Sequence, residues 1–270
     1  MTARIFATIV VAIIAALAAI MTGAWIAWRS SKNSGWIDTT WTFGLGAVGC
    51  VGALIPVWLY GVTPRPLLVA GLVAVWSLRL GLHIAQRTAK ITDDPRYGKL
   101  VRNWGADASR QMFFLAQKQA VVSIPLALSM VLAAWNPAPG LRLQDLLGAL
   151  ALLIGIAGEA VADHELRRFR TDPANRSRIC DAGLWAWSRH PNYFFEWFGW
   201  IAYPLLAIDP GGAYPWGWLA LAGPACMYWL LVHVSGIPPL EERMLERRGG
   251  EFRAYQARTN AFFPAPPRQI

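Results

Sequence analysis

The chain has 270 residues, of which 55% are hydrophobic and 15% charged, and its mean hydropathy is +0.34. Soluble domains are less apolar and more highly charged, so this composition excludes a soluble enzyme or a nucleic-acid module. The formal net charge of +9 fits a membrane protein with basic loops near anionic lipid. We therefore expect an integral membrane protein that contacts membrane lipids, with no nucleic-acid partner and no obligate protein partner.

Seven stretches approach the roughly 20 apolar residues that a membrane-spanning helix requires. The first is too long for the apolar region of a signal peptide, so we expect it to be retained. The sixth is short and aromatic. The expected spans are 5–27, 43–61, 66–86, 112–135, 144–165, 193–208 and 214–236. The predicted fold class is an all-α integral membrane protein with seven transmembrane helices, formed by one domain over residues 1–270.

The distribution of basic residues predicts an orientation for these spans. Twenty of the 25 Lys and Arg residues fall in the connections 29–42, 87–111 and 166–192 and in the tail from 237, and three fall on the opposite side. Under the positive-inside rule the amino terminus lies outside, and the basic loops and the carboxyl terminus are cytoplasmic. We expect a bacterial inner membrane. The amphipathic pattern of the tail from Pro238 predicts a short helix at the cytoplasmic membrane surface.

Gly44, Gly46 and Gly49 match the glycine spacing of dinucleotide-binding turns. The match is not specific, because no strand precedes the glycines and no acidic residue follows about 20 positions later. Small residues inside a span are better explained by close helix packing.

Asp38 lies between Trp36 and Trp41, just before the second expected span. A carboxylate among interfacial aromatic rings needs a partner. Two interpretations have equal weight: an acid that acts on a substrate, or an N-cap of the following helix.

Charged residues recur in the fifth span at spacings of four, four and three, which places them on one helix face. They are Glu159, Asp163, Arg167 and Arg170. They could form a ladder of salt bridges along the helix or the wall of a water-filled groove.

A second polar motif runs from Ser188 to Glu196. Pro191 favours a helix start, and the free backbone N–H groups of that start, beside Arg189 and His190, could bind phosphate. Asn192 and Glu196 then share a face. The alternative is a simple N-cap with Tyr193 at the membrane interface.

Further candidates lie in the connection 87–110 and in the tail. Arginine offers forked donors to phosphate, and tyrosine offers a ring that can stack on adenine. The candidates are Arg87, Arg96, Tyr97, Glu241, Arg243 and Tyr255. Basic loops also serve topology and bind lipid headgroups, so single arginines in them are weak signals. The three cysteines include no C-x-x-C pair, and no residue set has metal-ligand spacing.

In combination and order, these motifs resemble the membrane steroid 5-alpha-reductase family, particularly its bacterial branch. The similarity extends from about residue 87 to the end and includes Gly183-Leu184-Trp185, Arg189-His190-Pro191-Asn192-Tyr193 and the tail segment from Gly236 to Arg243. Sterol reductases share the Arg-His-Pro-Asn-Tyr string. Isoprenylcysteine methyltransferases carry a related Arg-His-Pro.

The resemblance implies a seven-helix fold that holds NADPH in one cytoplasm-facing chamber and delivers hydride to a polarised C=C bond of a lipophilic substrate. Carried over by position, Asp163, Arg170, Asn192 and Glu196 would contact the cofactor, and Arg87 would meet phosphate. With the additions from local chemistry, the expected cofactor-binding set is Arg87, Arg96, Tyr97, Glu159, Asp163, Arg170, Arg189, His190, Asn192, Tyr193, Glu196, Glu241, Arg243 and Tyr255.

The sequence departs from the steroid-reducing members at the substrate end. Their Gln-Glu pair before the second span is replaced by Thr39-Thr40, and their tyrosine in the third span by Ile84. Asp38 is then the candidate catalytic acid, on the expectation that desolvation between tryptophan rings keeps it protonated. A methyltransferase that uses S-adenosylmethionine, and a lipid-binding protein without catalytic activity, are the alternatives.

Overall fold

The computed structural model describes residues 1–176 and 178–268, which contain helices and, over these residues, no strand. The expected all-α class is confirmed for this part of the chain. The chain forms two compact units. Unit 1 consists of Met1–Leu146 and Tyr203–Gly223, and unit 2 consists of Leu147–Ala202 and Pro224–Ile270. The expected assignment of residues 1–270 to a single functional domain stays a prediction.

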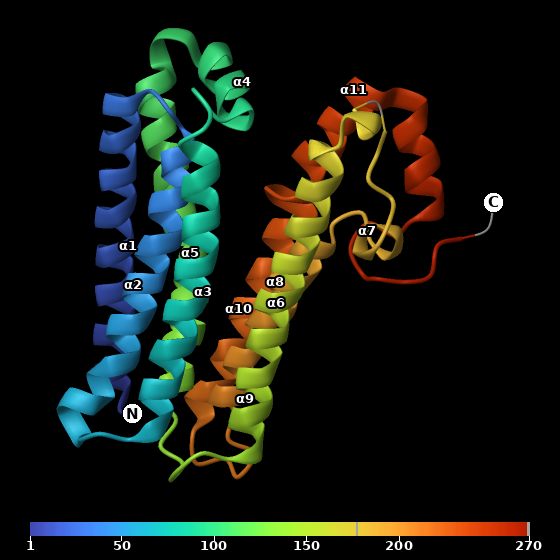
Figure 1. The fold of residues 1–270 in the computed structure, drawn as a ribbon. Coiled ribbons are helices and arrows are strands. Elements are labelled where there is room, and N and C mark those ends of the chain that lie inside the picture. Colours follow the sequence, from blue (N-terminus) through green and yellow to red (C-terminus); the bar gives the residue numbers. More distant parts are fainter. Residues whose placement is uncertain (177, 269–270) are drawn as a thin grey trace. The chain divides into compact units, whose positions relative to one another are not determined.

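Unit 1 is a bundle of four long helices that run side by side (Figure 1). They are α1 (Ala3–Ser31), α2 (Gly35–Tyr60), α3 (Pro64–Thr88) and α5 (Ala108–Ala134). The short helix α4 (Pro95–Trp104) lies at one end of the bundle and contacts α5. The chain returns to unit 1 at Tyr203, the second residue of α9 (Ala202–Ala207), and continues there through the 3-10 segment η3 (Pro215–Leu221), which packs on α5.

The glycines of α2 let neighbouring helices approach closely. A Cβ atom on Gly46 would lie 2.1 Å from Ser77 Oγ on α3, and one on Gly49 would lie 2.5 Å from Met130 Sδ on α5. Neither distance is compatible with a side chain. The interpretation of this glycine string as a packing surface is confirmed, because it lies inside a helix and not at a turn.

The end of the bundle away from α4 is closed by a buried ion pair. Arg65 and Asp145 are 2.8 Å apart, with side chains 2% and 0% exposed. Arg65 also donates to the backbone carbonyls of Asn136, Ala138 and Gly140. The guanidinium therefore fixes the connection after α5 onto the start of α3, which is a structural role.

Unit 2 is assembled on α6 (Leu143–Thr171), whose first turn belongs to unit 1. Its other helices are α7 (Leu184–Trp187), α8 (Pro191–Trp200), α10 (Ala222–Trp229) and α11 (Ile237–Arg258), shown from yellow to red in Figure 1. A Cβ on Gly155 of α6 would lie 2.7 Å from Phe195 O, so α6 and α8 are in close contact. The predicted helix start at Pro191 is confirmed. The predicted tail helix is confirmed as α11, with a bend at Gly249, where φ is 47°.

Six helical stretches in the part of the chain that the structure describes are long and apolar enough to cross a membrane, by length and composition. Four are α1, α2, α3 and α6; the other two are Arg96–Ala134, which includes α5, and Pro215–Arg258, which joins η3, α10, the π-helical segment Leu230–Val234 and α11. They correspond to six of the seven expected spans. The expected span 193–208 is instead split into α8 and α9. Pro204 accounts for the break, because it has no N–H to donate to the carbonyl of Trp200, the last residue of α8. The expected orientation assumed seven spans and stays a prediction.

Candidate functional site

The first polar cluster lies in unit 1, at the amino-terminal turn of α2. Asp38 Oδ2 is 2.5 Å from a terminal nitrogen of Arg96, and Asp38 Oδ1 accepts a hydrogen bond from the Tyr97 hydroxyl at 2.7 Å. Gln119 on α5 donates to the same hydroxyl oxygen at 2.8 Å. We call Asp38, Asp94, Arg96, Tyr97 and Gln119 the Asp38 cluster. It connects α2, α4 and α5.

Asp94 positions the arginine of this cluster. Its side chain caps α4 by accepting from the backbone N–H of Arg96, and it accepts two further bonds from that guanidinium, at 3.0 and 2.8 Å. Arg87 on α3, with its side chain 49% exposed, lies 3.5 Å from Asp94. Burial would raise the pKa of Asp94, but the hydrogen bonds and charge of Arg96, aided by Arg87, hold it below its ordinary value.

These contacts revise the expected environment of Asp38. The N-cap of α2 is Ser34, so the interpretation of Asp38 as the N-cap is wrong. Asp38 is ion-paired with Arg96, whose terminal nitrogen lies 2.5 Å from Asp38 Oδ2. The hydroxyl proton in the cluster belongs to Tyr97, which donates it to Asp38. The catalytic role of Asp38 stays a prediction, and Tyr97 becomes the better candidate for a proton donor.

Unit 2 brings together two polar motifs predicted to act together. Asn192 on α8 donates to Asp163 on α6 at 3.3 Å. Glu159, one turn before Asp163, is 6% exposed, and Glu196 accepts from the indole of Trp200 at 2.9 Å. The carboxylates and the amide on α6 and α8 therefore lie on surfaces that face each other within the unit. Their role in cofactor binding stays a prediction.

Arg189 forms a closed network with the tail. Its Nε and a terminal nitrogen bind both oxygens of Glu241, at 2.8 and 3.1 Å, and its other terminal nitrogen donates to the carbonyls of Gln256 and Thr259. Gln256 Nε2 donates to Glu241 Oε2 at 2.7 Å, and His190 Nε2 lies 3.0 Å from Glu241 Oε1. We call Arg189, His190, Glu241 and Gln256 the Arg189 network. It fastens α11 to the segment before α8.

Three more of the expected cofactor-binding residues, Tyr193, Arg243 and Tyr255, lie near this network. His190 stacks on Tyr193 with ring centroids 5.6 Å apart, and burial holds the pKa of His190 below its usual value despite the Glu241 hydrogen bond. The Tyr255 hydroxyl donates to the carbonyl of Trp185. Arg243 is half-buried on α11 and, within the described residues, makes no ion pair. Most donors of the Arg-His motif are therefore used inside the protein.

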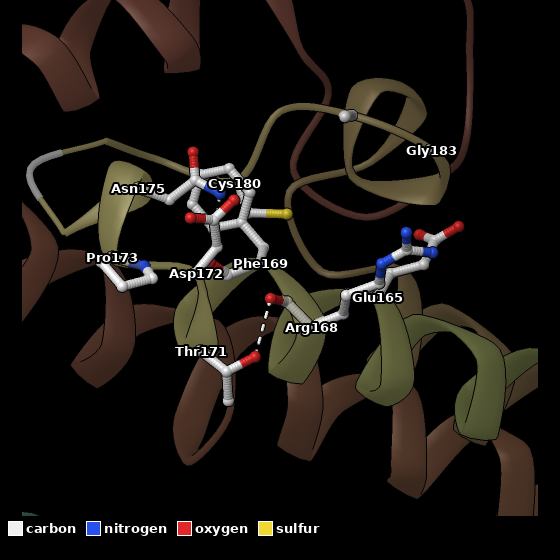
Figure 2. Close-up of a pocket in the computed structure, with 10 residues that line it drawn as sticks. Glu165, Arg168, Phe169, Thr171, Asp172, Pro173, Asn175, Cys180 and Gly183 are labelled. Carbon is white, nitrogen blue, oxygen red and sulfur yellow. Dashed lines mark hydrogen bonds between the residues drawn. The ribbon is translucent and has the colours of Figure 1, made fainter.

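A cavity of about 600 Å³ opens at the carboxyl end of α6 in unit 2 (Figure 2). Arg170 lies between the lining residues Phe169 and Thr171 in the chain but does not line the pocket, and none of the lining residues was among the expected site residues. The lining consists of Glu165, Arg168, Phe169, Thr171, Asp172, Pro173, Asn175, Cys180, Ala182 and Gly183. We call it the α6 pocket.

Local hydrogen bonds fix the walls of the α6 pocket. Glu165 accepts from the backbone N–H of Leu184 at 2.9 Å, and Asn175 donates to the carbonyl of Phe169 at 3.2 Å. Gly183, with φ of 60°, lies so near Glu165 that a Cβ would be 2.4 Å from its carboxylate. Arg168 is exposed and, in residues 1–176 and 178–268, forms no ion pair; the same holds for Arg170. The pocket therefore contains one guanidinium, that of Arg168, which shares the lining with Glu165 and Asp172 but forms no ion pair with either.

The turn signals Asp172-Pro173 and Ala182-Gly183 could have identified this pocket in the sequence, since they fold the chain back over the end of α6. Glu165, Arg168 and Phe169 lie off the face of the charged stripe and were missed for that reason. The expected residues divide between the units: Asp38, Arg87, Arg96 and Tyr97 belong to unit 1, and the others to unit 2. Their convergence on one chamber stays a prediction.

Comparison with known proteins gives one match. A family described as "Protein of unknown function (DUF1295)" matches residues 24–259, which is most of the chain. No curated protein and no solved structure matches it.

Proposed function

The chain belongs to the DUF1295 family, and from this premise we propose that it is an integral membrane reductase that uses NADPH. Hydride would be transferred to a polarised C=C bond of a lipophilic substrate, as in the steroid 5-alpha-reductases that its motifs resemble. The family match includes the segments that resemble the steroid 5-alpha-reductases, up to residue 259, and supports that resemblance. The six long apolar helices support a membrane location, where a lipophilic substrate would dissolve.

The observation that carries the proposal is the α6 pocket with Arg168, an arginine that forms no ion pair among the described residues. A dinucleotide needs a cavity of several hundred Å³ and donors for its phosphates, and the pocket volume of about 600 Å³ is in the usual range for ligand sites. Arg168 lines the pocket, and Arg170 follows two residues later on α6. Phe169 adds an aromatic face. These residues fit part of a nucleotide, with arginine for phosphate and an aromatic ring for the base.

This assignment changes which arginines would bind phosphate. The sequence predicted a phosphate site at the helix start beside Arg189 and His190, and the resemblance implied a phosphate contact for Arg87. Arg189, however, already donates to Glu241 and to two backbone carbonyls. Arg168 and Arg170 have no such partners in the described residues. We therefore assign the phosphate contacts to the end of α6 and a structural role to Arg189.

The Asp38 cluster is the proposed substrate-binding group. When bound, NADPH supplies a hydride. The chain must then stabilise negative charge on the substrate oxygen, and Arg96 offers a cation that is 29% exposed. Tyr97 is held by Asp38 and Gln119, and it would deliver the proton by turning its hydroxyl hydrogen, which Asp38 accepts in this structure, toward the substrate oxygen. This arrangement takes the place of the carbonyl-binding residues that the sequence lacks at Thr39, Thr40 and Ile84.

A second candidate function, methyl transfer from S-adenosylmethionine, is favoured by the acids of the α6 pocket. Glu165 and Asp172 both line it. Carboxylates bind ribose hydroxyls well but repel the additional 2′-phosphate that distinguishes NADPH from NADH. The balance between Arg168 and these acids therefore decides which nucleotide fits.

Nucleotide binding tests the proposal directly. The full chain is purified in detergent, copurifying nucleotides are identified by mass spectrometry, and NADPH, NADH and S-adenosylmethionine are titrated by calorimetry. We expect NADPH to bind best, and Arg168→Gln and Arg170→Gln each to weaken it about tenfold, since a charged hydrogen bond is worth about 1.5–3 kcal/mol.

Arg253→Gln is the matched control, because Arg253 is an exposed arginine of α11 outside the α6 pocket. It should leave NADPH affinity unchanged. Binding of S-adenosylmethionine alone would replace the reductase with the methyltransferase. Absence of binding by all three nucleotides would refute both.

A further inference from the structure

A second hollow lies in unit 1, on the apolar surface formed by α1, α2 and α5. Its volume is about 540 Å³. We call it the α1–α2 groove. Its lining includes Arg4, Ala12 and Ala16 of α1, Ala47 and Gly52 of α2, and Trp135, which follows α5. None of these residues belongs to the Asp38 cluster or to the α6 pocket.

Small side chains on the two helices create the groove. Ala12 and Ala16 of α1 face it together with Ala47 and Gly52 of α2. The indole of Trp135 donates to the carbonyl of Gly52 at 3.1 Å, which fixes the ring in the wall. The walls are therefore almost entirely hydrocarbon, with the Trp135 ring held in place by its hydrogen bond.

One end of the groove is charged. Arg4 lies in the first turn of α1, is exposed, and in the part of the chain that the structure describes makes no ion pair. The hydroxyl of Thr8 donates to the backbone carbonyl of Arg4 at 3.0 Å, so this polar group is already satisfied. No acidic residue is among the described residues that line the groove. A ligand would meet hydrocarbon along its length and one cation at its end.

The dimensions match one leaflet of a membrane. Arg4 to Ala16 on α1 covers about 18 Å at 1.5 Å per residue, slightly more than half of a hydrocarbon core of about 30 Å. The first turn of α1 also carries the positive end of the helix dipole, which adds to the charge of Arg4. The ligand that fits has an apolar chain about one leaflet long and a negative headgroup.

We propose that the α1–α2 groove binds one acyl chain of an anionic phospholipid, with the lipid phosphate against Arg4. The phospholipid comes from the surrounding leaflet. The site is independent of the proposed reductase activity, because it uses no residue of the nucleotide or substrate groups. Arg4 confers selectivity for an anionic lipid, and the small residues provide room for the chain.

Native mass spectrometry of the full chain tests this site. The detergent-solubilised protein is exchanged into an equal mixture of phosphatidylglycerol and phosphatidylcholine, and the retained lipid is counted. The wild-type protein should retain one phosphatidylglycerol molecule per chain in preference to phosphatidylcholine. Arg4→Gln should lower that preference about fivefold, the equivalent of about 1 kcal/mol per basic residue near an anionic surface, and Arg4→Lys should restore it.

Ala12→Phe should abolish retention of both lipids by filling the groove. Two controls should behave like wild type: Ala19→Phe, on an exposed part of α1 outside the groove, and Arg110→Gln, an exposed arginine of α5. Thermal unfolding shows whether each variant is folded. If folded Arg4→Gln or Ala12→Phe retains phosphatidylglycerol like wild type, or if the controls lose it equally, the bound lipid is nonspecific and the proposal fails. NADPH affinity serves as a separate readout, which should not change.

Discussion

The Asp38 cluster of unit 1 and the Arg189 network of unit 2 both join arginine to a carboxylate, but they differ in what remains available to a ligand. Arg189 donates to Glu241 and to two carbonyls, and its side chain is 10% exposed. Arg96 is 29% exposed, and in its cluster Gln119 Oε1 has no hydrogen-bond partner among the described residues. A closed network stabilises the fold, whereas an incompletely satisfied one can accept a ligand.

The largest expected effect is on turnover and concerns the Asp38 cluster. Tyr97→Phe should lower the turnover number with an enone substrate about 10²–10³-fold, as expected for loss of one donor to a developing oxyanion. The rate is measured as substrate-dependent oxidation of NADPH. Stability should fall by about 2–4 kcal/mol, because Tyr97→Phe removes two hydrogen bonds, one to the Asp38 carboxylate and one from Gln119.

Asp38→Asn distinguishes the two candidate acids. If Tyr97 is the donor, Asp38→Asn should lower turnover less than Tyr97→Phe, because an amide still accepts from the hydroxyl. If Asp38→Asn abolishes turnover and Tyr97→Phe does not, Asp38 is the acid, as the sequence first suggested.

The next effect is on stability and concerns the Arg189 network. The guanidinium of Arg189 is largely buried, and Glu241→Ala removes the carboxylate that pairs with it. The free energy of unfolding should therefore fall by about 3 kcal/mol. The measurement is thermal unfolding of the detergent-solubilised chain. Arg253→Gln on the same helix should change stability by less than about 0.5 kcal/mol. A Glu241→Ala variant as stable as wild type but unable to bind NADPH would turn the Arg189 network into a ligand site.

The smallest effect is a pH dependence at His190. Burial lowers the native pKa of His190, whereas in the unfolded chain it titrates near about 6.5. Below that pH the unfolded state binds more protons, so stability should fall as the pH drops through about 6.5. The midpoint of thermal unfolding should decline by a few degrees between pH 7 and 5, and His190→Gln should reduce this slope. An unchanged slope would show that other groups dominate.

Local signals predicted much of the fold correctly. Hydropathy located six of the membrane-spanning helices, and Pro191 marked the start of α8. The expected span 193–208 was wrong as a single helix, because Pro204 interrupts the backbone hydrogen bonds that the hydropathy profile does not register. The glycine string 44–49 was correctly assigned to packing.

The candidate site was less predictable, because it depends on pairing between distant residues. Arg189 and Glu241 are 52 positions apart, and Asp38 and Tyr97 are 59 apart. No periodicity links such positions. The α6 pocket was missed for a related reason: its walls come from two turns that fold back on a helix end, and each turn alone is an ordinary surface feature.

Composition and motif order alone determined that this is a helical membrane protein and which family it resembles, because hydropathy, helix-start chemistry and residue order are properties of adjacent positions. The tertiary structure decided which arginines form ion pairs, which side chain donates its hydroxyl hydrogen to Asp38, and where cavities remain. Charge and hydrogen bonding act over a few ångströms in space, and only folding determines which side chains come within that range.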